Sequence, residues 1–216
     1  MSPVSALIAT TETIPSSGRA ASDMSEAMLM KSTLRDMPVD EALAAVDAGA
    51  AFVDLRPVES YLEVHVPGSM ALLYEFGPGL AARARDCLPL NLPLVLLDLG
   101  QGNLMHAAAS FRGKGFTVLG KIDDGINQWA TERGTPISTE IVSEPEGLVL
   151  DVGDPGASAG DDAVLIPLEK LWARAAELGD EQRVTIASGY GVRAALAVGI
   201  LERGGHEVAI WTSTSN

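Results

Sequence analysis

The sequence predicts an α/β fold made of two tandem units, each with a central parallel sheet flanked by helices. Two observations support this prediction. From residue 37 onwards, short apolar runs alternate with stretches of helical periodicity, which is the pattern of parallel α/β proteins. The order of these parts then restarts: Asp54 has a counterpart in Asp151, and the glycines at 100 and 102 have counterparts at 189 and 191. We therefore expect one sheet in each repeat.

The first repeat contains a regular series of expected elements. Pro38 can occupy the first turn of a helix that stops at Gly49, and the apolar run at 51–55 is typical of a buried strand. Residues 93–98 (PLVLLD) form the most apolar of the expected strands. The other elements are helices at 79–87, 106–115 and 125–133 and a strand at 116–119.

The second repeat is shorter. Strands are expected at 148–152, 183–187 and 207–211, and helices at 167–178 and 193–204. Residues 1–30 lack periodicity and are expected to form a disordered tail. We divide the rest into a first domain at 31–140 and a truncated second domain at 141–216, with residues 138–147 as the linker. Because so short a domain gains little stability alone, we expect it to pack on the first.

Composition excludes several classes of function. Acidic residues outnumber basic ones 29 to 15 among 216 residues, a net charge of −14, so nucleic acid is a poor partner. The chain has no apolar run of the ~20 residues that a membrane helix needs and no basic cluster for an anionic membrane. The start lacks the basic region of a signal peptide, so we expect a cytoplasmic protein. The lone Cys87 excludes an intrachain disulfide, and His65, His106 and His206 share no ligand spacing, so neither metal nor cofactor is expected.

Glycine-rich turns follow an apolar strand in each repeat, at residues 98–105 and 188–194. Such turns lie at the carboxyl ends of parallel strands, where open α/β sheets bind ligands. Their glycines let backbone N–H groups converge, and the following helix adds its positive end. The second turn also carries an arginine. It therefore predicts an anion-binding loop made of Ser188, Gly189, Tyr190, Gly191, Val192 and Arg193.

Motifs in both repeats resemble those of the rhodanese family of sulfurtransferases, in order and in approximate spacing. In the first repeat they are residues 53–57 (VDLRP), 65–69 (HVPGS), 124–129 (DGINQW) and 134–136 (GTP). In the second they are residues 150–152 (LDV), 163–168 (AVLIPL), 189–194 (GYGVRA) and 200–203 (ILER). The arrangement is especially similar to the paired rhodanese modules behind persulfide dioxygenases of the metallo-β-lactamase fold, although the H-x-H-x-D-H metal motif of that neighbour is absent. The resemblance implies two tandem rhodanese-like domains.

The resemblance also implies which residues take the positions of the family's active loop, C-x-x-G-x-R-[SA]. In that loop the Cys accepts sulfur as a persulfide, while loop N–H groups and the Arg hold the anion of the sulfur donor. With the loop glycines aligned, Leu99 and Ser188 fall on the cysteine position. Leu104 and Arg193 fall on the arginine position. The first loop thus lacks both residues, and the second lacks the thiol.

The missing thiol determines the expected function. A serine oxygen cannot form the S–S bond of a persulfide, and a hydroxyl needs an adjacent general base to become a nucleophile. We therefore expect a pseudoenzyme without thiosulfate sulfurtransferase activity, with a binding or regulatory role toward a small sulfur oxyanion or a protein partner in sulfur metabolism. Two alternatives stay open: a weak or atypical sulfurtransferase acting on small sulfur oxyanions or persulfides, and a purely structural interaction module.

Several single residues also have more than one interpretation. Ser188 can cap a helix, bind an anion or act as a nucleophile, and Arg193 can bind an anion or pair with a neighbouring acid. Cys87 is expected to be a buried apolar residue outside both loops, and His65 to orient a loop. Residues 189–194 also match a dinucleotide fingerprint, but the acid that the fingerprint requires after the next strand is missing.

Overall fold

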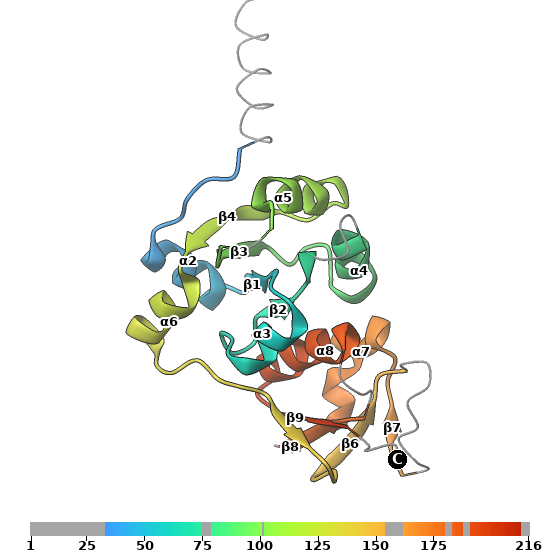
Figure 1. Ribbon diagram of the computed structural model, residues 1–216. Helices are drawn as coiled ribbons and strands as arrows, with labels where there is room; N and C mark the ends of the chain where they lie inside the picture. The colour runs from blue at the N-terminus through green and yellow to red at the C-terminus, as the bar shows by residue number, and fades with distance from the viewer. Residues whose placement is uncertain are drawn as a thin grey trace, which may run out of the picture. The chain divides into compact units, whose positions relative to one another are not determined.

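The first parallel sheet has the strand order β2-β1-β3-β4 (Figure 1). This computed structural model describes residues 33–74, 79–100, 102–153, 162–179, 183–187 and 191–212, so the expected tail at 1–30 lies outside the described residues. The strands of this sheet are β1 (Ala51–Asp54), β2 (Met70–Ala71), β3 (Leu94–Asp98) and β4 (Val118–Asp123). They alternate with α2 (Val39–Asp47), α3 (Val58–Glu63), α4 (Gly79–Cys87), α5 (Leu104–Gly113) and α6 (Gly125–Arg133).

Helices cover both faces of this sheet, which explains the unbroken apolar run of β3. Successive side chains of a strand point to opposite faces. Leu94 and Leu96 belong to the cluster that includes buried residues of α4 and α5, whereas Val95 and Leu97 belong to the cluster formed with α2. Both sets therefore have to be apolar, as in other parallel sheets with two covered faces.

The second sheet is also parallel, in the order β5-β9-β8-β6-β7. Its strands are β5 (Glu140–Val142), β6 (Leu148–Asp151), β7 (Val164–Leu165), β8 (Arg183–Ile186) and β9 (Glu207–Trp211). Two helices, α7 (Leu168–Arg174), which continues as a 3-10 turn at Ala175–Leu178, and α8 (Val192–Arg203), contribute buried side chains to its core. Read from β7, the order β7-β6-β8-β9 repeats that of β2-β1-β3-β4, with β5 added at the end. The predicted α/β class with parallel sheets flanked by helices is confirmed.

The segment expected to be a linker contains a strand. Residues Glu140, Ile141 and Val142 pair in parallel with Ala209, Ile210 and Trp211 of β9. The proposed boundary between residues 140 and 141 therefore falls within β5. Two consecutive β-branched residues favour this extended conformation, although glycine and proline nearby suggested a loop.

Helix α8 packs against strand β2 as well as against β8 and β9. It is buried along nearly its whole length because it is made of small and aliphatic residues, and its residues from Ala194 to Leu201 are all buried. Gly199 allows the close approach to β2: a Cβ there would lie 2.0 Å from the carbonyl oxygen of Ser69. One hydrophobic cluster consequently contains side chains from both sheets.

Residues Leu34–Asn216 form one compact unit. Within the described ranges, no helix is both long enough and apolar enough to cross a membrane.

Candidate functional site

The first glycine-rich loop connects β3 to α5, as expected. Gly100 and Gly102 have φ values of +81° and +71°, in the left-handed region that favours glycine. Gly102 is needed for a second reason, because a Cβ there would lie 2.9 Å from the ring of Tyr74. Asn103 caps α5 by accepting a hydrogen bond from the backbone N–H of His106 at 3.0 Å. Leu99, which is predicted to fall on the cysteine position, is half-buried and packs against the core.

Acidic groups dominate the charge beside this first loop. A surface pocket of about 410 Å³ is lined by Leu34, Asp98, Gly102, Asn103, Leu104, Met105 and Lys121. The ammonium of Lys121 lies 2.8 Å from Asp98, 3.0 Å from Asp36 and 2.5 Å from Asp123. The hydrogen bond from Lys121 lowers the pKa of Asp98, and the Asp123 and Asp98 carboxylates raise the pKa of Lys121. One cation facing three carboxylates makes this pocket unsuitable for an oxyanion.

The second loop follows β8 and leads into α8. Ser188, Gly189 and Tyr190 lie outside the described residues, whereas Gly191, Val192 and Arg193 are described. Gly191 has an extended backbone and directly precedes α8, and Val192 packs against the hydrophobic core. Of the six residues predicted for the loop, Arg193 is the described one with a charged side chain.

Arg193 contacts two segments at the carboxyl end of the second sheet. Its Nη2 donates to the carbonyl oxygen of Val152, just after β6, at 2.8 Å. Its Nη1 and Nη2 donate to the two carboxylate oxygens of Glu169, in α7, at 2.6 and 3.2 Å. The hydrogen bonds from Arg193 lower the pKa of Glu169. Of the two interpretations of Arg193, the described contacts match pairing with an acid.

Cys87 is the last residue of α4 and belongs to neither loop. It is only 4% exposed. The pKa of its thiol is raised to about 11, mainly by burial and then by the charge of Glu169, and Arg193 opposes the rise. At pH 7, about one thiol in 10⁴ is therefore ionised, and the thiolate is the nucleophilic form. The structure thus places Cys87 within electrostatic range of the Arg193–Glu169 pair, in an environment that suppresses its reactivity.

Asp54 and His65, which lie in the motifs of the first repeat, have structural contacts. Asp54 is fully buried and accepts hydrogen bonds from the side chain of Arg56, whose Nη2 also donates to the carbonyl of Val64 at 2.6 Å. His65 is fully buried, with Nδ1 2.8 Å from the carbonyl oxygen of Tyr61 and Nε2 3.0 Å from the carboxylate of Glu202. His65 therefore fixes a loop, and it also joins that loop to α8.

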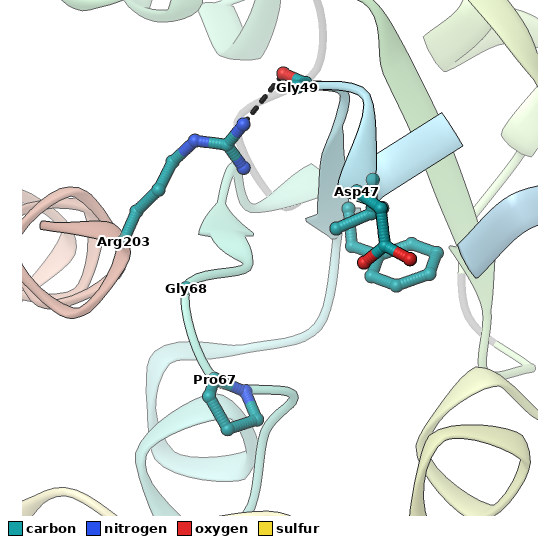
Figure 2. Close-up of a pocket in the computed structure, with 7 residues that line it drawn as sticks. Asp47, Gly49, Pro67, Gly68 and Arg203 are labelled. Carbon is teal, nitrogen blue, oxygen red and sulfur yellow. Dashed lines mark hydrogen bonds between the residues drawn. The ribbon is translucent and has the colours of Figure 1, made fainter. Parts of the chain in front are cut away.

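A second pocket, of about 350 Å³, lies beside the end of α8 and is lined by Val46, Asp47, Gly49, Phe52, Pro67, Gly68 and Arg203. Figure 2 shows Arg203 reaching from α8 toward Gly49. Its guanidinium donates to the carbonyls of Gly49 and Ala50 at 2.6 and 2.9 Å, and burial lowers its pKa. Asp47 is paired with Arg133 at 2.5 Å. Arg203 thus joins α8 to the turn before β1, and Asp47 joins α2 to α6. Sequence reasoning missed this role of Arg203, for which the available signal was an arginine that follows the apolar run Ala194–Leu201 near the end of α8.

The described residues contain no group of three or more His, Cys, Asp or Glu side chains that could hold a metal ion.

The curated relatives that this chain matches are thiosulfate sulfurtransferases of about half its length. No protein-family model matches the sequence. The thiosulfate sulfurtransferase GlpE of Pseudomonas syringae pv. syringae is 30% identical over 95 residues, which cover 44% of this chain and 86% of that protein. The same enzyme of Pseudomonas savastanoi pv. phaseolicola is 29% identical over 93 residues, covering 43% of this chain and 84% of that protein, and that of Stutzerimonas stutzeri is 30% identical over 93 residues, covering 43% and 82%.

Two solved structures are also similar. A thiosulfate sulfurtransferase from Pseudomonas aeruginosa has 15% sequence identity and a TM-score of 0.37, with 92% of this chain matching 46% of that one. The BH2092 protein from Bacillus halodurans has 21% identity and a TM-score of 0.39, with 55% of this chain matching 86% of that one.

Proposed function

Because this chain belongs to the rhodanese-like sulfurtransferase family, we propose that it is a protein of sulfur metabolism that binds a small sulfur oxyanion without transferring its sulfur by the family's mechanism. One observation carries the proposal: the chain has a single cysteine, Cys87, and that cysteine ends α4 instead of lying in either loop. Leu99 and Ser188 take the positions at which a thiol is needed.

The chemistry of the missing step supports this proposal. Transfer from thiosulfate to a loop cysteine forms a persulfide S–S bond while the S–S bond of thiosulfate breaks and sulfite leaves. A leucine side chain has no nucleophile, and a serine oxygen cannot make that bond. The Cys87 thiol is 4% exposed and has a pKa raised to about 11, so it supplies very little thiolate at neutral pH.

The two loops differ in their suitability for an oxyanion. Beside the first loop, the positive charge of Lys121 faces Asp36, Asp98 and Asp123, so we assign that loop a structural role. The second loop retains Arg193, whose planar guanidinium suits a tetrahedral or planar oxyanion. We therefore propose the second loop as the binding loop, formed by Ser188, Gly189, Tyr190, Gly191, Val192 and Arg193. We also propose a cytoplasmic location and a partner that handles persulfides, in line with the resemblance to modules found beside persulfide dioxygenases.

The test is a cyanide–thiosulfate assay on the purified full chain and on two variants. We expect no thiocyanate above background from the wild type, and we expect Ser188→Cys to gain measurable turnover because it restores the missing thiol. Cys87→Ser should behave like the wild type. Wild-type turnover comparable to that of an ordinary rhodanese would overturn the proposal, and loss of that turnover in Cys87→Ser would identify Cys87 as the sulfur carrier.

A purely structural interaction module is the second candidate, favoured by the pairing of Arg193 with Glu169. Thermal unfolding in sodium thiosulfate at constant ionic strength separates the two candidates, because a ligand that binds the native state raises its midpoint. A rise in the wild type that is absent from Arg193→Ala supports anion binding. An unchanged midpoint in both proteins supports the structural module.

A further inference from the structure

The arginine of the second loop is bound by a carboxylate of its own chain. We propose that Glu169 occupies the anion position at Arg193, so that an external oxyanion binds there only by displacing the Glu169 side chain. This inference rests on the proposed function and adds a built-in competitor to the same site.

The geometry of the pair resembles that of a bound oxyanion. Two nitrogens of Arg193 each donate to a different oxygen of Glu169, at 2.6 and 3.2 Å. Sulfate and thiosulfate present a pair of oxygens to a guanidinium in the same fork-like manner. The hydrogen bond from Nη2 to the carbonyl of Val152, at 2.8 Å, holds the guanidinium in place independently of Glu169. Arg193 can thus keep its position when the carboxylate leaves.

The exposure of the pair distinguishes it from a structural ion pair. The side chain of Glu169 is 42% exposed and that of Arg193 is 24% exposed. In the buried pair of Asp54 and Arg56, the side chain of Asp54 is 0% exposed and that of Arg56 is 11% exposed. Ion pairs with substantial exposure contribute little to stability, and their charged ends are readily resolvated. Glu169 can therefore rotate into solvent at a small free-energy cost, whereas Asp54 cannot.

The negative charge of Glu169 should weaken the binding of an external oxyanion at Arg193. With Glu169 in place, the pair is neutral, within a chain whose net charge is −14. Replacing Glu169 with glutamine keeps the size and the hydrogen-bonding oxygen but leaves a net positive charge at Arg193. An exposed pair of this kind shifts an equilibrium up to about fivefold, which sets the expected gain in affinity.

The test is isothermal titration calorimetry of sodium thiosulfate into the full chain at constant ionic strength. The variants are Glu169→Gln and the matched control Glu177→Gln, which removes a carboxylate from an exposed pair with Arg174 in the same region of the chain. We expect Glu169→Gln to bind up to about fivefold more tightly than the wild type, Glu177→Gln to match the wild type, and Glu169→Gln combined with Arg193→Gln to lose binding.

The possible failures are distinguishable. Equal affinity of the wild type and Glu169→Gln would overturn the competitor and leave the proposed function standing. An equal gain in Glu177→Gln would also overturn it, since the effect would then reflect overall charge alone. If neither the wild type nor Glu169→Gln bound thiosulfate, the proposed anion site itself would be wrong, and the competitor with it. Binding by Glu169→Gln alone would support the inference strongly.

Discussion

Replacing Glu202 with alanine should destabilise the protein because its carboxylate joins α8 to the loop between α3 and β2. The carboxylate oxygens lie 3.0 and 3.1 Å from Nε2 of His65, and one of them accepts from the backbone N–H of Gly68 at 2.9 Å. His65 is fully buried and stacks on Tyr61 with a centroid distance of 4.2 Å. Alanine would leave Nε2 of His65 and the backbone N–H of Gly68, both in buried residues, without these partners.

The magnitude follows from the groups left unpaired. A buried polar group left without its hydrogen-bond partner costs about 1–3 kcal/mol, and Glu202→Ala would leave two such groups, Nε2 of His65 and the N–H of Gly68. The side chain of Glu202 is 7% exposed, so little solvent screening is available. We therefore expect Glu202→Ala to lower the free energy of unfolding by about 2–6 kcal/mol, a large share of the total stability of a typical domain.

Glutamine at the same position separates hydrogen bonding from charge. Its amide oxygen can accept from Gly68, and its amide nitrogen can donate to Nε2 of a neutral His65 ring, whose Nδ1–H still faces the Tyr61 carbonyl. All these groups then keep a partner. We expect Glu202→Gln to lose only about 1 kcal/mol, in the range of one net hydrogen bond.

The assay is urea unfolding at pH 7, followed by circular dichroism and by tryptophan fluorescence. Glu177→Ala, in an exposed ion pair, serves as the control and should be indistinguishable from the wild type. If Glu202→Ala lost less than about 1 kcal/mol, or no more than Glu202→Gln, the Glu202 carboxylate would not stabilise the contact between α8 and the loop that holds His65 and Gly68.

Three further predictions concern packing, charge and the thiol. Gly199→Ala should lower the free energy of unfolding by about 2–3 kcal/mol, against the usual helix preference for alanine, because its Cβ would lie 2.0 Å from the carbonyl oxygen of Ser69, just before β2. Gly113→Ala, which has open space around it, should be neutral or slightly stabilising in the same urea titration. Lys121→Met should destabilise by up to about 1 kcal/mol at pH 7. Lys121 lowers the folded-state pKa of Asp98, so the stability gained from this contact is present above about pH 4 and is lost as the pH falls through the folded-state pKa. The difference in stability between Lys121→Met and the wild type should therefore shrink in acid. A difference that stayed constant with pH would contradict this explanation. At pH 8, the native Cys87 thiol should react with iodoacetamide at least about 100-fold more slowly than the urea-unfolded chain, and comparable rates would show that burial does not raise its pKa.

Much of the fold could be predicted from local sequence pattern. The run at 93–98 became β3 because an unbroken apolar strand needs two covered faces, and α2 and α6 were predicted to within a few residues because their starts and ends carry proline, glycine or charge signals. The short elements α3, β2 and β7 were missed. With two to six residues each, they are stabilised by pairing with distant segments and leave little periodicity to detect.

The position of each candidate loop could be predicted, but the partners of its charged residues could not. The contact between Arg193 and Glu169 spans 24 residues, and that between His65 and Glu202 spans 137. Both depend on how α7 and α8 pack, which no local pattern determines. Gly102 is a similar case: its positive φ is typical of a loop glycine, whereas the nearness of the Tyr74 ring depends on tertiary structure.

The burial of α8 limits how this protein can be dissected. The helix contacts β2 of the first sheet as well as β8 and β9 of the second. Each half of the chain therefore buries apolar side chains of the other half. A fragment ending after α6 would expose to water the apolar residues against which α8 packs. The complementary fragment would expose the apolar side chains of α8 itself. Such fragments should therefore tend to aggregate, which would make assays on them unreliable. The two loops are therefore best compared by single substitutions in the intact polypeptide.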